Sequence, residues 1–122
     1  AMSSEGGQAT VRAGALLSKT YRAFKSFREF KRAMGSAGEG KSWHHIIEQH
    51  AGNLKRFGAE ALHNTENVIK VETKVHTEIS AFYSSKQPET GFMVVREWLR
   101  TQSYEQQRAY GLKVLRRFGI IP

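Results

Sequence analysis

The chain has 122 residues, enough for one domain with a modest hydrophobic core. It contains no cysteine, which excludes disulfides and thiolate-bound zinc, so any metal ligand must be His, Asp, Glu or Asn. The formal net charge of +8 indicates a polyanionic partner, with nucleic acid favoured over an acidic protein or an anionic membrane.

The first predicted element is a basic amphipathic helix from about Gln8 to Met34. Its aromatic stripe favours a core-facing seam over a base-stacking surface, and its basic residues fit either a phosphate-binding or a solvated face. The glycine-rich segment 35–40 is expected to end the helix and act as a hinge. Residues 1–40 are therefore predicted to form a basic helical arm, and residues 41–122 the main domain.

The middle of the chain predicts the order strand, loop, strand, helix. The expected segments are a strand at 42–49, irregular polar chain at 50–58, one helical turn at 59–62, a polar loop at 63–67, a strand at 68–71 and a helix at 73–83. Thr73 is the expected N-cap of that helix.

The C-terminal third predicts a loop at 84–91 and two supporting helices, at 92–100 and 103–118. Ser103 followed by Gln106 has the spacing of a capping box. The fold class predicted from these elements is α+β, mostly helical.

Three histidines and an asparagine in the middle segment suggest a hydrolytic site. His44 and His45 precede two isoleucines, Asn67 precedes the second strand, and His76 lies on the helix after it. One divalent cation and one neutral imidazole can together activate a water and neutralise a phosphodiester. Adjacent residues of a regular strand face opposite sides, so a bend or bulge would be needed for both histidines to reach one metal.

Residues 42–83 resemble the His-Asn-His (HNH) nucleases, which have the ββα-metal fold. The resemblance is to the Trp-His-His and Ala-His-His branches, which occur as C-terminal toxin domains of bacterial polymorphic toxins of the Rhs or contact-dependent inhibition type. It rests on Trp43-His44-His45-Ile46-Ile47, on Asn67 before the alternating Val68-Ile69-Lys70-Val71, and on the spacing of His76 from Asn67.

By that resemblance, the fold has a ββα-metal (HNH-like) core. His44 and His76 would be metal ligands, His45 the general base, and Asn67 the residue that braces the loop carrying His45. Where many members have a second helix ligand, this chain has Ser80. The coordination of one divalent ion (Mg, Mn, Ni or Zn) would then be completed by Asn64, Glu72, water or substrate.

The resemblance implies a metal-dependent endonuclease, with DNA favoured over RNA as its substrate. Such a domain would be secreted or contact-delivered as part of a larger toxin and would act in the cytoplasm of the target bacterium. A cognate acidic immunity protein is the implied partner, and a monomer is expected. No apolar run approaches the ~20 residues of a membrane span, so stable membrane insertion is not expected.

Two other functions remain open from the residues. In the first, His45 with His63 or His76 is the base–acid pair of a metal-independent ribonuclease. In the second, the chain is a non-enzymatic basic module that binds nucleic acid, and its histidines are structural. Asn64 is an alternative to Asn67 as the functional asparagine.

Overall fold

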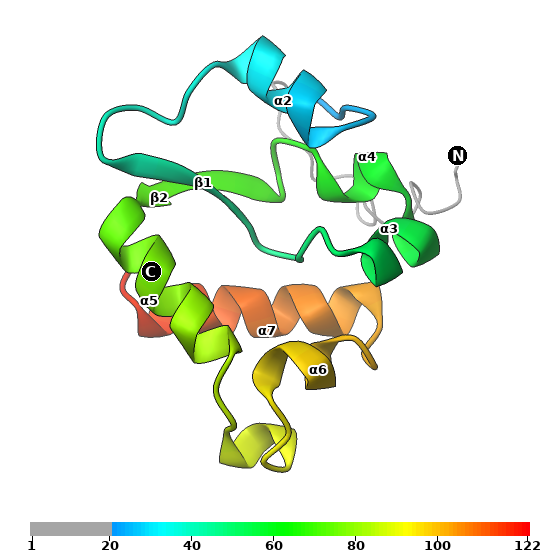
Figure 1. Cartoon of the computed structure of the whole chain (residues 1–122), viewed down its shortest axis with the longest axis vertical. Helices are drawn as coiled ribbons and strands as arrows, with labels where there is room; N and C mark the ends of the chain where they lie inside the picture. The colour runs from blue at the N-terminus through cyan, green and yellow to red at the C-terminus, as the bar shows by residue number, and fades with distance from the viewer. Residues whose placement is uncertain (1–20) are drawn as a thin grey trace. The chain divides into compact units, whose positions relative to one another are not determined.

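The computed structural model describes residues 21–122, which form a small α+β fold, about half helical, with one two-stranded antiparallel sheet (Figure 1). The elements in chain order are α2 (Phe27–Met34), β1 (Lys41–His45), α3 (Ala51–Phe57), α4 (Ala59–Leu62), β2 (Val68–Glu72), α5 (Thr73–Tyr83), the 3-10 helix η2 (Pro88–Thr90), α6 (Val95–Leu99) and α7 (Tyr104–Arg117). The predicted α+β class and the order of the two strands and the following helix are confirmed.

The chain divides into two compact units. One contains the described residues up to Ser36 together with Trp43–Ile69, and the other contains Ala37–Ser42 and Lys70–Pro122. The predicted division between residues 40 and 41 stays a prediction. Within residues 21–122, no helix has both the length and the apolar content needed to cross a membrane.

The predicted helix from Gln8 to Met34 is wrong over residues 21–26, and its first part lies outside the described residues. The helix begins only at Phe27, because the Ser26 hydroxyl caps it by accepting from the backbone N–H of Glu29 at 3.0 Å. Before that point the chain is extended and bonds to the loop around residue 64: Ala23 forms an antiparallel bridge with Asn64. A local aromatic repeat is therefore overridden by tertiary pairing.

The core of the first unit is aromatic on its α2 side. Phe30 has no exposed surface and packs edge-on against Phe24 and Trp43, with ring centroids 5.5 and 5.0 Å apart. The Trp43 indole N–H donates to the carbonyl of Gly35, the C-cap of α2, at 3.1 Å. The predicted core-facing role of the aromatic stripe is thus confirmed at Phe30.

The prediction of irregular chain at 50–58 is wrong, because Ala51–Phe57 is helical. His50 is the N-cap, and its Nδ1 accepts from the backbone N–H of Asn53 at 3.2 Å. The Asn53 side chain is fully buried and donates to the carbonyl of Glu48 at 2.8 Å. A capping histidine and a buried asparagine therefore order a segment that its glycine and asparagine suggested was a turn.

The second unit is built on α5, α6 and α7 (Figure 1). Its most buried apolar side chains are those of Ile79, Tyr83, Val95, Val114 and Leu115. The predicted helix start at Ser103 is confirmed, since its side chain accepts from the backbone N–H of Gln106 at 3.1 Å.

Two helix starts in the second unit differ from the prediction. Thr73 is the first residue of α5 rather than its N-cap, which is Glu72, and the Thr73 hydroxyl is bonded to that of Ser42 at 2.8 Å. The helix expected from residue 92 begins at Val95, because Phe92 has a left-handed φ of 64° that a right-handed helix cannot contain.

Candidate functional site

Two buried histidines from different segments of the chain meet in the first unit. His45 Nε2 lies 3.1 Å from His63 Nδ1, and their rings are nearly perpendicular, at 85°. His45 is the last residue of β1, and His63 directly follows α4. The structure thus brings together two imidazoles that are 18 residues apart in the sequence.

Phe27 fixes the orientation of both rings. Its ring packs edge-on against His45 at 4.8 Å between centroids and stacks on His63 at 6.0 Å. His45 is 8% exposed and His63 is 3% exposed. Both residues are therefore buried, His45 slightly less so than His63.

Asn67 ties together the segments that carry these two histidines. Its side chain has no exposed surface. Its Oδ1 accepts from the backbone N–H of Ile47 at 2.9 Å, and its Nδ2 donates to the carbonyls of Ile47 and Leu62 at 3.0 and 2.9 Å. Because Ile47 lies two residues after His45 and Leu62 immediately precedes His63, one side chain sets the spacing of both imidazoles. The contact expected of Asn67 with the chain after His45 is present, and its catalytic role stays a prediction.

The side chain of Asn64 is equally buried, but its hydrogen bonds stay within residues 60–66. Its Oδ1 accepts from the backbone N–H of Glu66 at 2.9 Å, and its Nδ2 donates to the carbonyl of Glu60 at 2.8 Å. Its backbone carbonyl accepts from the N–H groups of Asn67 and Val68. Asn64 therefore shapes the turn before β2, while Asn67 joins the two histidine segments.

His44 faces away from this pair. Trp43 and His45 both contact α2 through their rings, so strand alternation directs the intervening His44 to the opposite face of β1. His44 is 5% exposed. The two adjacent histidines thus lie on opposite faces of β1, and the chain bends at Ile46 and Ile47, directly after the strand ends at His45.

His76 lies on α5 in the second unit, and so do Glu72 at its N-cap and Ser80. Burial lowers the pKa of the half-buried His76 imidazole. Glu72 and Ser80 are exposed. His44 belongs to the other unit, so the pairing of His44 and His76 as ligands stays a prediction.

Burial also lowers the pKa of His63. The neutral imidazole is therefore the dominant form at pH 7, and Nδ1 of His63 can accept a hydrogen bond from His45. The tautomers of the two rings decide whether His45 Nε2 or His63 Nδ1 carries the proton of this hydrogen bond. A neutral acceptor next to His45 would stabilise an imidazolium formed there, because hydrogen bonds from a charged donor are stronger than neutral ones.

One cation lies over the Phe27 ring, which packs against both histidines. Lys31 Nζ lies 4.6 Å from the centroid of Phe27. The exposed basic residues on α2 and just before it are Arg22, Lys25, Arg28, Lys31 and Arg32. A polyanion that approaches α2 would thus meet cationic side chains on the helix that packs against His45.

The ligands expected from the sequence, His44 and His76, would donate imidazole nitrogens, which fit a transition metal better than magnesium. Imidazole nitrogen suits Zn²⁺ and Ni²⁺, whereas Mg²⁺ prefers oxygen ligands. Among residues 21–122, no group of three or more His, Asp or Glu side chains is arranged to hold a metal ion. The proposed ligands His44 and His76 therefore rest on the sequence pattern alone.

Phe27 was outside the reach of the sequence pattern, and His63 was expected only as one of two alternative acid–base partners of His45. Phe27 gave no signal beyond its place in the aromatic stripe. His63 had one weak signal, since it directly precedes the polar Asn64-Thr65-Glu66-Asn67 loop.

Comparison of the chain with models of protein families, with curated proteins and with solved structures finds no match.

Proposed function

We propose that this chain is a metal-dependent endonuclease domain of the HNH type, with DNA as its main substrate and His45 as the general base. The observation that carries the proposal is the His45–His63 contact at 3.1 Å, held by the side chain of Asn67. The exposed basic residues of α2 support a nucleic-acid substrate, because cationic side chains bind the phosphate backbone regardless of sequence.

The proposal uses the tautomer in which His45 Nε2–H donates to His63 Nδ1. The other ring nitrogen of His45 then has the lone pair that accepts a proton from the attacking water. The imidazolium formed at His45 is stabilised by its hydrogen bond to the neutral His63. Asn67 acts as a positioning residue, since it restrains the backbone next to each histidine.

A divalent ion completes the proposal, with His44 and His76 as the ligands expected from the sequence. When bound, such an ion stabilises the negative charge that develops on the scissile phosphate. The ββα-metal core belongs to the same proposal and is supported by the order β1, β2, α5. On the sequence resemblance, the domain would be the delivered part of a bacterial toxin whose producer makes an acidic immunity protein.

The test is cleavage of supercoiled plasmid by the purified chain with Mg²⁺, Mn²⁺, Ni²⁺ or Zn²⁺, and with EDTA. The variants are His45→Ala and, as a matched control, His50→Ala, which removes a histidine whose side chain caps α3. We expect nicking that requires metal, is lost in His45→Ala and persists in His50→Ala. Equal cleavage by both variants would refute the role of His45.

The proximity of His45 and His63 also favours a second candidate, a metal-independent ribonuclease in which these two imidazoles carry out the acid–base steps. In that reaction the 2′-hydroxyl of RNA is the nucleophile, so a metal is not required. Degradation of total RNA in EDTA, with plasmid left intact, would support this candidate over the first. If neither polymer is cut, the non-enzymatic binding module is the better account.

A further inference from the structure

The turn between η2 and α6 exposes two apolar side chains. Phe92 is 65% exposed and Met93 is 44% exposed. Phe92 has φ 64°, and among residues 21–122 it is the only non-glycine residue with a positive φ. A bulky side chain rarely adopts the left-handed region, and such outliers concentrate at functional positions. The exposure of Phe92 together with its strained backbone therefore suggests a binding role.

The turn that carries Phe92 and Met93 is held in place by hydrogen bonds within its own loop. The backbone N–H of Phe92 donates to the carbonyl of Gln87 at 2.8 Å. Thr90 is 2% exposed, and its hydroxyl is 2.7 Å from the carbonyl of Met93 and 3.0 Å from that of Gln87. An aromatic ring presented on an ordered loop loses little conformational entropy when a ligand binds to it.

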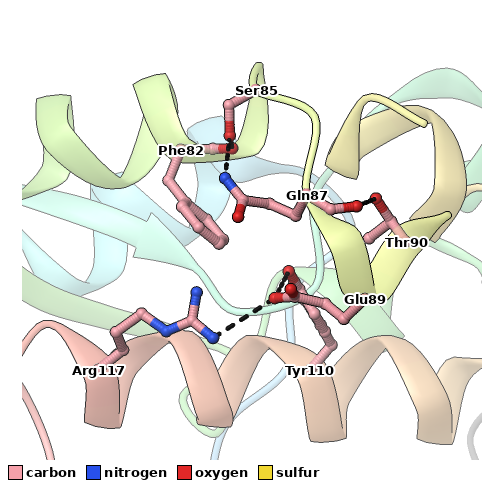
Figure 2. Close-up of polar contacts among 7 residues, drawn as sticks. All are labelled: Phe82, Ser85, Gln87, Glu89, Thr90, Tyr110 and Arg117. Carbon is pink, nitrogen blue, oxygen red and sulfur yellow. Dashed lines mark hydrogen bonds and ion pairs between the residues drawn. The ribbon is translucent and has the colours of Figure 1, made fainter. Parts of the chain in front are cut away.

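The acidic residue of this loop is directed toward α7. Tyr110 Oη donates to Glu89 Oε2 at 3.2 Å, and Arg117 Nη2 lies 3.4 Å from the same oxygen (Figure 2). A backbone hydrogen bond is the largest cause of the lowered pKa of Glu89, and the side-chain hydrogen bonds from Tyr110 and Arg117 and the charge of Arg117 lower it further. The exposed Lys86 stands at the base of the loop, where it bridges to Val94. With Glu89 paired to Arg117, the cation of Lys86 is the remaining charge of the loop.

We propose that residues 86–94 form a contact for single-stranded nucleic acid, in which a base stacks on Phe92 and Lys86 neutralises a neighbouring phosphate. An accessible aromatic ring on the same loop as a cation supplies the two kinds of contact, stacking and phosphate neutralisation, with which proteins bind unpaired nucleotides with little sequence preference. A protein partner is less favoured, because two side chains offer far less apolar surface than a stable protein interface buries. The inference rests on the proposed function and deepens it, since it names the strand form of the substrate held at this loop.

The experiment measures binding of the full chain to labelled 20-nucleotide single strands and to the matching duplex by fluorescence anisotropy, in EDTA and at low salt. Phe92→Asn removes the ring but keeps a residue that tolerates a left-handed φ, and Phe92→Trp keeps a stacking ring. Leu54→Gln is the control, because Leu54 is another exposed apolar residue, 38% exposed on α3. We expect Phe92→Asn to weaken single-strand binding about tenfold and duplex binding less than twofold, with Phe92→Trp and Leu54→Gln close to wild type.

Unchanged single-strand binding by Phe92→Asn would overturn the proposal, as would failure of the wild-type chain to bind any oligonucleotide. An equal loss for Phe92→Asn and Phe92→Trp would overturn the stacking contact. Plasmid cleavage assayed in parallel separates this inference from the proposed function. Cleavage without any effect of Phe92→Asn on binding would refute only the loop contact, whereas Phe92-dependent binding without cleavage would refute only the nuclease.

Discussion

Asn67→Ala should be the most destabilising single change in the candidate site. The substitution leaves three backbone groups without their side-chain partners: the N–H and carbonyl of Ile47 and the carbonyl of Leu62. Each buried polar group that loses its partner costs about 1–3 kcal/mol. Allowing for partial relaxation, we expect a loss of about 3–5 kcal/mol, a large fraction of the roughly 5–15 kcal/mol that stabilises a typical domain.

Urea unfolding followed by circular dichroism gives this loss directly, and a thermal melt should show a decrease of about 10–20 °C in Tm. Asn64→Ala is the matched control, because Asn64 is also fully buried but its side chain bonds only to Glu60 and Glu66, in partly buried surroundings. Its expected cost is about 1–3 kcal/mol. The reasoning would be refuted if Asn67→Ala lost less than about 1 kcal/mol, or no more than Asn64→Ala.

Three further predictions follow from local structure. Burial lowers the pKa of His63 and of His76, so these two histidines bind protons more tightly in the unfolded chain than in the folded one. The Tm should therefore be constant above about pH 6.5, the ordinary histidine pKa, and should fall as the pH decreases below that value. A Tm that stays constant or increases as the pH is lowered from 7.5 to 5.5 would contradict this prediction. Ser103→Ala should cost about 1 kcal/mol in urea unfolding, while Ser103→Asp should retain the cap; equal stability of both variants would argue against it. Phe92→Asn should raise Tm or leave it unchanged, because it removes left-handed strain of about 1 kcal/mol at an exposed ring, and a clear decrease would show that the ring supports the fold.

The elements set by local chemistry could be predicted from the sequence. The alternating Val68–Val71 run gives β2, and the spacing of Ser103 and Gln106 gives the start of α7. In each case the deciding interaction joins residues close in the chain. The contact of Asn67 with the chain after His45 was also anticipated, although only through resemblance to a family pattern.

The errors fall where distant contacts decide the conformation. Residues 21–26 have the spacing of a helix, but Ala23 pairs with Asn64 and Phe24 N–H donates to the carbonyl of His63 at 2.9 Å. Extended chain at residues 21–26 allows backbone hydrogen-bonding groups of this segment and of the loop around residue 64 to pair with each other. The helix at 51–57 was missed because histidine is an uncommon N-cap and the buried amide of Asn53 has no local signature. Neither interaction could be inferred from periodicity.

The separation of His44 and His45 by strand alternation limits what the pair can do. Adjacent imidazoles on one strand cannot act as interchangeable copies, because each has different neighbours. His45 shares the α2 face with Phe27 and His63, where a buried neutral partner can stabilise a proton taken from water. His44 points to the opposite face, so a ligand role for His44 and a base role for His45 require no competition for one position. Under the proposed function, the two-histidine motif would therefore supply a metal ligand on one face of β1 and a general base on the other.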